Sequence, residues 1–491
     1  MRMTRRKLLK GSIAAAAAST FGAALEAGDT GEAGEETSGR RPSNLALGLA
    51  QTLHKASYAD FSATAVKHAK MILASTLASA APGTKIESAK IIRDLAKERA
   101  GKAEASIWFD NARLPLTEVS RVNAMLSDAA ASDDSDLRNV AHTGTSLTAL
   151  GLAITEKTGA SGRDLLTAIM TGYESAGRMT EALHNMRTGL HASLIVAFGG
   201  VAAASKLLGL TAEQMAQAIG LTEVTMGGIL IGTDSWAREY QAGNAALCAI
   251  NAAQAAGRGF TVNPDLMEAR GGFIDLYGNG KADVARLTRP VGPDPDIVKY
   301  LAIKLVPGAH ALHSSVEAAV NASKQANVAP EQVAKILLSG PSKTSITYNT
   351  KPPTNMIEAI HSLPYFVASA VADRDFSWVH VTPEKIHRPV IARLIGLVEY
   401  DPNPPEVHYN WNWGGTVTIV TTSGARFTNT VDAPRGSGPR GIEWSDVDAK
   451  YHALISDSGL PAKRTGELLQ MIHDFDQVKR VSEFTRLLQT A

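Results

Sequence analysis

The residues with the clearest capacity for chemistry gather in one short segment, residues 129–144. They are, in chain order, Asp133, Asp134, Asp136, Arg138 and His142. Carboxylates close to a histidine are residue types that can remove a proton from a carbon acid. An alanine-rich run precedes the segment and an apolar run follows it, so we expect it to connect two helices. A solvated connection with an incidental histidine and an acid–base site are both consistent with this pattern.

Three further histidines are candidates for a site. His191 lies among small residues in Gly-Leu-His-Ala-Ser, which fits a core histidine with satisfied hydrogen bonds as well as a site residue. His310 and His313 are three residues apart, a spacing found in metal sites, but no matching carboxylate motif follows them. One of this pair is expected to face solvent, and no metal is predicted.

Composition narrows the class of protein. Lys and Arg number 49 against 48 Asp and Glu, and this formal charge of +1 gives no support to a nucleic-acid partner. The one cysteine, Cys248, rules out an intrachain disulfide, a cysteine-ligated iron–sulfur cluster and a cysteine-rich zinc site. With 491 residues, the chain is long enough for two or more domains.

The first 43 residues are expected to be an export signal followed by a disordered tether. Arg5 and Arg6 precede an apolar run over residues 11–25, which is typical of a twin-arginine signal. That run is short and alanine-rich for a membrane span. We therefore predict a periplasmic protein without a membrane segment in its mature form; a basic amphipathic start with no targeting role is the alternative.

Residues 44–298 carry a helical pattern. Ser161-Gly-Arg-Asp164 and Thr211-Ala-Glu-Gln214 match helix starts, and Gly209 is placed to end a helix. The many Ala and Gly residues predict close helix–helix contacts. Since no strand leads through a glycine-rich phosphate loop into a helix, the pattern favours a bundle over a doubly wound sheet.

The pattern changes near Tyr300. Strands are expected at residues 335–339 and 378–381, a hairpin at 416–427, and helices at 315–326 and 383–398. Helix returns after residue 441, with Ser445-Asp-Val-Asp448 as a cap and further helix over 462–488. The expected fold is mainly α: a large helical domain (44–298 and 435–491) interrupted by a smaller α+β domain (299–434).

Short motifs spread over residues 44–488 resemble, as an ordered set, the MmgE/PrpD family. They are Asn123 followed by the acidic segment and His142, Asp164-Leu-Leu, Gly172-Tyr-Glu174, Gly189-Leu-His191, Ala202-Ala-Ala-Ser-Lys-Leu-Leu-Gly-Leu210, Gly243-Asn-Ala-Ala, Lys304-Leu-Val-Pro307 with His313, Tyr348-Asn-Thr-Lys351-Pro352, and His361-Ser-Leu-Pro-Tyr365. The family includes 2-methylcitrate dehydratase, cis-aconitate decarboxylase and iminodisuccinate epimerase. The resemblance implies a helical domain with an α+β lid, a homodimer, and a site in the cleft between the domains.

The resemblance also implies chemistry without a cofactor on small di- and tricarboxylates. A proton is removed beside a carboxylate, and loss of water, loss of carbon dioxide or return of the proton to the other face completes the reaction. The residues that match catalytic positions of the family are His142, His191, Tyr348 and His313. The residues expected to bind substrate are Arg238, Lys351, Ser135 and Asp134.

Two positions depart from the family pattern. Ala131 stands where the family has its first loop aspartate, and Arg238 stands where it has a lysine. Arginine keeps the positive charge and can bind a carboxylate with two hydrogen bonds, but it does not exchange protons near neutral pH. The aspartates at 133, 134 and 136 are the candidates to replace the missing carboxylate.

Together these observations predict a cofactor-independent lyase of the hydro-lyase type that acts on a small di- or tricarboxylate. His142 and His191 would be acid–base groups, Arg238 and Lys351 would hold carboxylates, and Tyr348 would be a proton donor or oxyanion partner. The alternatives on the same scaffold are an epimerase or isomerase and a decarboxylase. A catalytically degenerate exported binding protein is a further alternative of a different class.

Overall fold

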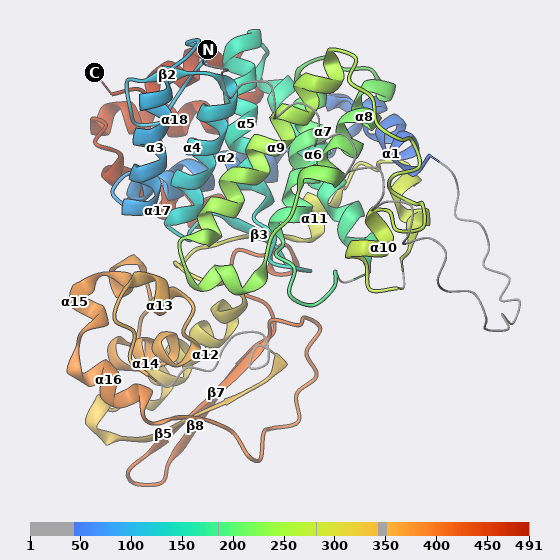
Figure 1. Ribbon diagram of the computed structural model, residues 1–491. Helices are drawn as coiled ribbons and strands as arrows, with labels where there is room; N and C mark the ends of the chain where they lie inside the picture. Colours follow the sequence, from blue (N-terminus) through green and yellow to red (C-terminus); the bar gives the residue numbers. More distant parts are fainter. Residues whose placement is uncertain (1–43, 185, 281, 342–350, 491) are drawn as a thin grey trace, which may run out of the picture. The chain divides into compact units, whose positions relative to one another are not determined.

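Helices form most of the computed structural model, which describes residues 44–184, 186–280, 282–341 and 351–490 (Figure 1). The export signal and tether expected over residues 1–43, and Tyr348, lie outside the described residues. The first helical stretch contains α1 (Leu45–Lys55), α2 (Ala63–Gly83), α3 (Glu87–Arg99), α4 (Leu116–Ala129), α5 (Thr143–Thr158), α6 (Gly162–Leu183), α7 (Ser193–Leu207), α8 (Ala212–Thr225), α9 (Ala237–Gly257), α10 (Phe273–Tyr277) and α11 (Asp296–Lys299). The chain returns to this region with α17 (Trp444–Ile455), α18 (Ala462–His473) and α19 (Val481–Leu487).

Two predicted helix starts are confirmed. At the start of α6, Ser161 and Asp164 form a reciprocal capping box, and Thr211 and Gln214 do the same for α8. Each cap satisfies backbone N–H groups that have no partner within the helix, a contribution of about 1 kcal/mol. Gly209, in the left-handed conformation with φ of 69°, ends the turn after α7 as expected.

Small residues bring the helices close together, as their number in the sequence indicates. α6 packs against α7, and α9 packs against both α4 and α7. A Cβ atom added at Gly172 of α6 would lie 2.8 Å from the carbonyl oxygen of Gly199 in α7, so a larger residue does not fit at this crossing. Extensive apolar packing of this kind supplies most of the stability of such helices.

The α+β region has one four-stranded sheet. Its strands are β5 (Val333–Ser339), β6 (Val398–Tyr400), β7 (Gly415–Thr421) and β8 (Arg426–Val431), in the order β6-β5-β7-β8. β5 is parallel to β6, and the other pairs are antiparallel. α12 (His313–Ala326) packs against β7 and β8, and α14 (Leu363–Asp373) packs against α12 (Figure 1). The predicted hairpin is confirmed as β7 and β8.

Two expected elements of this region differ from the structure. Residues 378–381 form the 3₁₀ helix η7 (Trp378–Val381) rather than a strand. The helix expected over 383–398 is instead α15 (Pro383–Ile386), a break, and α16 (Pro389–Ile395). A proline disfavours helical backbone at the residue before it, so Pro389 begins a new helix and does not continue the previous one.

The helical segment after residue 441 begins differently from the sequence prediction. α17 starts at Trp444, and its N-cap residue Glu443 makes no side-chain cap. Ser445 and Asp448 therefore lie inside the helix, and the cap predicted for them is wrong. Packing of α17 against α2 takes the place of the cap in fixing where this helix lies.

The described residues hold two large apolar cores. One draws its buried side chains from residues 45–303 and 442–488, and the other from residues 312–431. The mainly α fold with a smaller α+β part therefore agrees with the sequence prediction. Among the described helices, none combines the length and the apolar character that a membrane crossing requires.

Candidate active site

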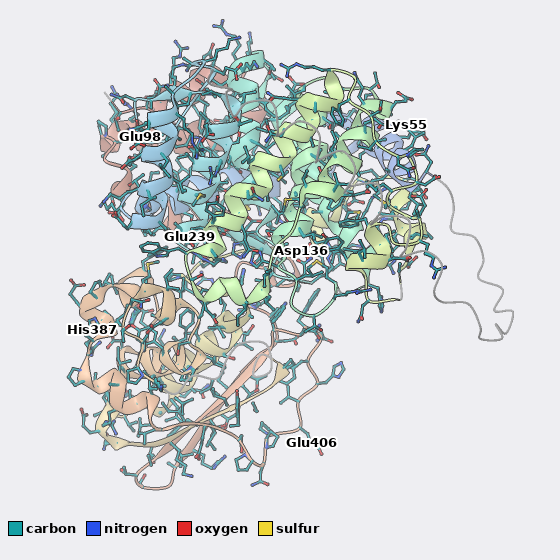
Figure 2. The ribbon with its side chains drawn as sticks, viewed as in Figure 1. Lys55, Glu98, Asp136, Glu239, His387 and Glu406 are labelled. Carbon is teal, nitrogen blue, oxygen red and sulfur yellow. The ribbon has the colours of Figure 1, made fainter. Side chains whose placement is uncertain are left out.

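The acidic segment is a buried strand. β3 (Asp134–Asp136) pairs antiparallel with β4 (Leu301–Ile303), with Ser135 opposite Ala302. Asp133 and Asp134 are fully buried. In Figure 2, Asp136 of β3 and Glu239 of α9 lie at the same end of the helical region. Buried carboxylates are tolerated only when hydrogen bonds or cations compensate them, so this burial excludes the solvated connection and points to a built site.

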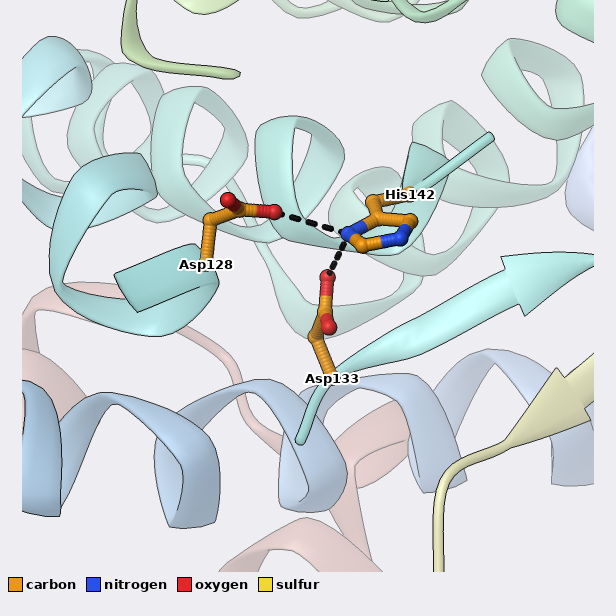
Figure 3. Close-up of side chains that lie close together, drawn as sticks. All are labelled: Asp128, Asp133 and His142. Carbon is orange, nitrogen blue, oxygen red and sulfur yellow. Dashed lines mark hydrogen bonds and ion pairs between the residues drawn. The ribbon is translucent and has the colours of Figure 1, made fainter. Parts of the chain in front are cut away.

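His142 is held by two carboxylates. It is the N-cap residue of α5, and its Nδ1 lies 2.7 Å from Oδ1 of Asp128 and 2.9 Å from Oδ2 of Asp133. Figure 3 shows the ring with this nitrogen between the two acids. Nδ1–H therefore donates to the carboxylates, and the opposite nitrogen, Nε2, is left for other partners.

This arrangement changes the protonation of the ring. Burial alone lowers the pKa of His142, but the charge of Asp133 and the hydrogen bonds of both acids outweigh burial and raise it to about 9. Burial raises the pKa of each acid, but nearby positive charges outweigh this effect. For Asp128 the main charge is that of Arg238, and for Asp133 the main charges are those of His142 and Lys304. The pKa of both acids is therefore lowered, and that of Asp133 falls well below its ordinary value. At neutral pH the cluster thus contains an imidazolium between two carboxylates.

Lys304 completes this cluster from the residue after β4. Its Nζ donates to Oδ1 of Asp133 at 2.8 Å and lies 3.3 Å from Nε2 of His142. The side chain is 1% exposed, so water does not screen these interactions. Lys304 thus places a second cationic side chain beside Nε2 of His142.

Arg238 approaches the same acids from the start of α9. Its Nη2 donates to the carbonyl oxygens of Asp128 and Ala129, at 2.8 and 3.1 Å, and its Nε lies 3.6 Å from Oδ2 of Asp128. These carbonyls belong to the last turn of α4, where the helix dipole favours a cation. Arg238 therefore fixes the end of the helix that carries Asp128.

A cavity of about 580 Å³ opens beside this cluster. The polar residues on its wall include Asp128, His142, His191, Arg238, Lys304 and His361. Burial, together with the charge of His142, lowers the pKa of His191 to about 4. Burial, together with the charge of Arg238, lowers the pKa of His361 to about 4 as well. Neutral and protonated imidazoles therefore line one cavity.

His191 has a defined hydrogen-bond role. Its Nδ1 accepts a hydrogen bond from the backbone N–H of Ser193, at 3.2 Å. A neutral ring with an accepting Nδ1 carries its hydrogen on Nε2. His191 is thus set to donate to a ligand oxygen.

Of the residues predicted from sequence, the structure places His142, His191 and Arg238 on the cavity wall, but not Asp134, Ser135, His313 or Lys351. Asp134 accepts from the backbone N–H of Gly144 and from the Tyr173 hydroxyl, and Ser135 hydrogen-bonds to His310. These two side chains hold the strand in place. Lys351 is exposed.

The expectation that His310 or His313 faces solvent is wrong. Each is only 4% exposed, and the two rings lie 4.4 Å apart between centroids. Burial lowers the pKa of His313 to about 3 and that of His310 well below its ordinary value. Both rings are therefore neutral and buried, and Ala309 and Ala311, which flank His310, line the cavity.

The alanine at position 131 does not deprive His142 of a carboxylate. Ala131 is fully buried, with φ of 51°, and packs against Ile360 and Val381. Asp128 and Asp133 instead bring their carboxylates to His142 from either side. Asp133 is one of the aspartates that the sequence offers as a replacement, whereas Asp128 lies in the last turn of α4, just before the acidic segment, and the sequence pattern does not point to it.

Lys450, which the sequence did not single out, supports this segment from α17. Its Nζ donates to Oγ of Ser75 at 2.6 Å, to the carbonyl oxygen of Asp133 at 3.3 Å, and to that of Ser132. Burial lowers the pKa of this lysine to about 7. A fully enclosed lysine bonded to two successive carbonyls fixes the backbone that presents Asp133.

Asp128, Asp133 and His142 are also the types of ligand that a metal ion prefers, and their ligand atoms lie within 4.8 Å of one another. However, His142 already bonds to both acids, and the cations of Lys304 and Arg238 lie against the same carboxylates. A divalent ion would be repelled by these neighbouring charges. The donor set fits a proton-transfer cluster better than a metal centre.

The chain is similar to known proteins over most of its length. The family model of the MmgE/PrpD N-terminal domain matches residues 48–285, and that of the MmgE/PrpD C-terminal domain matches residues 307–474. Cis-aconitate decarboxylase of Homo sapiens is 24% identical over 464 residues, which cover 90% of this chain and 94% of the relative. The enzymes of that name from Mus musculus and Aspergillus terreus are also 24% identical, over 86% and 67% of this chain and 89% and 71% of their own lengths.

Proposed function

Because the chain belongs to the MmgE/PrpD family, we propose that it is a cofactor-independent lyase acting on a small carboxylic acid. The observation that carries this proposal is the setting of His142. Two carboxylates hold its Nδ1, and its Nε2 lies beside Lys304 at the cavity. A histidine fixed in this way moves a proton at one defined point. The relatives named cis-aconitate decarboxylase act, by their names, on such an acid.

The roles follow from the charge of each group. His142, with a pKa of about 9, is protonated at neutral pH and donates a proton to a substrate carbon. Arg238 and Lys304 supply positive charge for the carboxylate beside that carbon. His191 donates from Nε2 to a substrate oxygen where negative charge develops. Tyr348 as a further proton donor, and Lys351 as a carboxylate ligand, are proposed from the family resemblance alone.

Decarboxylation suits this charge state better than loss of water. With a β,γ-unsaturated carboxylate, His142 transfers its proton to the γ carbon, and the bond between the α carbon and the carboxylate breaks. The electron pair of that bond forms the new α,β double bond, and carbon dioxide leaves. Dehydration begins with removal of a proton, for which His142 must first release its own. The hydro-lyase expected from sequence is therefore the second candidate.

The experiment is incubation of the full chain in deuterated water with citrate, 2-methylcitrate, cis-aconitate and amino-dicarboxylates, followed by NMR. Carbon dioxide release with one deuteron in the product supports decarboxylation, and a new alkene signal from citrate supports dehydration. Deuterium uptake with no other change supports epimerisation. An absence of any exchange, with compounds that still protect the chain against thermal unfolding, would show a binding protein instead.

A matched pair of variants tests the residue that carries the proposal. His142→Gln is expected to lose about 10²- to 10⁴-fold in turnover of the compound identified above, which is the usual contribution of general acid–base catalysis. His54→Gln, at an exposed position of α1, is the control and should keep full turnover. Full activity of His142→Gln would overturn the mechanism.

A further inference from the structure

The cavity beside His142 is lined by two chemically different groups of side chains, one charged and one apolar. The charged end carries His142, Arg238 and Lys304. Apolar side chains on the same cavity wall are those of Met186, Leu190, Val196, Leu230, Ile231 and Trp413. A site made only for a small polycarboxylate has no need for an apolar wall of this extent.

The apolar wall is a built part of the structure. The backbone N–H of Leu230 donates to the carbonyl oxygen of Gly189 at 2.8 Å, and that of His191 donates to Gly228 at 3.1 Å. These bonds join residues 189–191 to η2 (Leu230–Asp234). Trp413 is fixed by a hydrogen bond of 2.5 Å from its Nε1 to the carbonyl oxygen of Leu137.

The charges at the charged end are largely compensated within the protein. Among the described residues there, protonated His142, Arg238 and Lys304 face the carboxylates of Asp128 and Asp133. At most one positive charge remains for a ligand. The exposed carboxylate of Asp234, which belongs to η2 and also lines the cavity, disfavours a substrate carboxylate nearby.

The cavity volume is large enough for a ligand that has both a charged and an apolar part. A cavity of about 580 Å³ lies within the roughly 300–1,000 Å³ range of pockets that enclose drug-sized molecules. Burying an apolar group against the apolar wall removes both surfaces from water, which stabilises the complex.

We propose that the substrate is a carboxylic acid with one carboxylate at the reacting end and a bulky apolar substituent, which lies against the wall of residues 186–196 and 230–231. This inference rests on the proposed function for the position of the reacting carbon. It adds a preference for acids with an apolar body over small polycarboxylates.

The test uses the full chain and three probes that share the reacting group: 3-butenoate, 3-hexenoate and 3-decenoate, with cis-aconitate as the polyanionic reference. Binding is measured by calorimetry, and turnover or exchange by NMR in deuterated water. Affinity should rise with chain length, by up to about fourfold for each added methylene that is buried. Affinity that stays flat or falls with length, with cis-aconitate the tightest ligand, overturns the inference.

Two exposed isoleucines provide a matched pair. Ile231 is 76% exposed and lines the cavity, whereas Ile229 is 66% exposed and does not. Ile231→Asp should weaken 3-decenoate binding at least about tenfold more than it weakens 3-butenoate binding, because a charge beside an alkyl chain loses its water. Ile229→Asp should change neither. Equal effects of the two variants overturn the assignment of the wall.

Failure of this inference differs from failure of the proposed function. If cis-aconitate reacts and the longer alkenoates do not bind, the lyase stands and the apolar preference is wrong. If affinity rises with chain length but no probe reacts or exchanges, the apolar preference stands and the lyase is wrong.

Discussion

The charged and the apolar residues of the cavity wall differ in how firmly the protein holds them. At the charged end, His142, Asp133 and Lys304 each have at least two polar partners within the protein. The apolar wall consists largely of side chains from the segment before α7 and from η2, and Leu230 and Ile231 are 49% and 76% exposed. Several partners therefore hold the proposed proton carrier, whereas the η2 side chains that line the cavity are largely exposed. We therefore expect substitutions in η2 to change substrate preference without displacing His142.

The largest effect is expected at the charged residues. Asp133→Asn should lower turnover by at least about 100-fold. Asparagine keeps the size of the side chain but removes the charge that raises the pKa of His142 and pairs with Lys304. The pKa of His142, followed by NMR titration, should fall toward its ordinary value. An unchanged histidine titration would show that Asp128 alone sets the charge of the ring.

The second prediction concerns pH. The folded-state pKa of His142, about 9, lies above its ordinary value, so the proton it donates is present below this pH and is lost above it. The specificity constant, kcat/KM, should fall about tenfold per pH unit above about pH 9. The same pairing stabilises the fold fully below about pH 6.5, and this contribution disappears as pH rises through about 9. A profile that instead rises through this range contradicts proton donation by His142.

Lys450→Met should have an intermediate effect because this lysine acts through the backbone of Ser132 and Asp133. We expect kcat to fall about tenfold with KM little changed, and the free energy of unfolding to fall by about 1–3 kcal/mol as the buried carbonyls lose their donor. The control is Lys463→Met, at an exposed position of α18. A loss of stability with unchanged kcat and an unchanged pH profile would mean that Lys450 supports the fold but not the position of Asp133.

The smallest effect is expected at the apolar residues of the cavity wall. Ile231→Ala should change the free energy of unfolding by no more than about 0.5 kcal/mol, since the side chain is mostly exposed. Turnover of the smallest reactive acid should also stay the same, because the variant leaves the charged end intact. Chemical denaturation and initial-rate measurements on the two proteins check both statements. A large stability loss would show that the wall is as strongly held as the charged end.

The sequence was informative where one local signal decided the structure. Capping boxes placed α6 and α8, alternation with a Ser-Gly turn placed the β7–β8 hairpin, and family motifs led to His142 and His191. The sequence was not informative where contacts between distant residues decide the local structure. Asp134 and Ser135 carry polar side chains in a polar segment, yet pairing with β4 turns them into the interior.

Three site residues show why spacing alone was insufficient. Asp128 lies inside a helix, Lys304 follows a strand of three residues, and Lys450 comes from a helix far along the chain. Lys304 begins the family motif Lys304-Leu-Val-Pro307, but nothing in the local sequence of Asp128 or Lys450 distinguishes them from ordinary surface charges. Only the tertiary fold brings their side chains, or the backbone they hold, to His142. The homodimer and the export signal predicted from sequence stay predictions.

The contact from Lys450 has a consequence for the order in which the molecule is assembled during synthesis. The ribosome makes β3 long before α17, so the carbonyls of Ser132 and Asp133 have no ammonium partner until residue 450 has emerged and α17 has docked on α2. The entire α+β region is synthesised in that interval. The charged end of the cavity is thus among the last parts to reach its final geometry, and an incomplete chain that ends before α17 lacks the group that sets it.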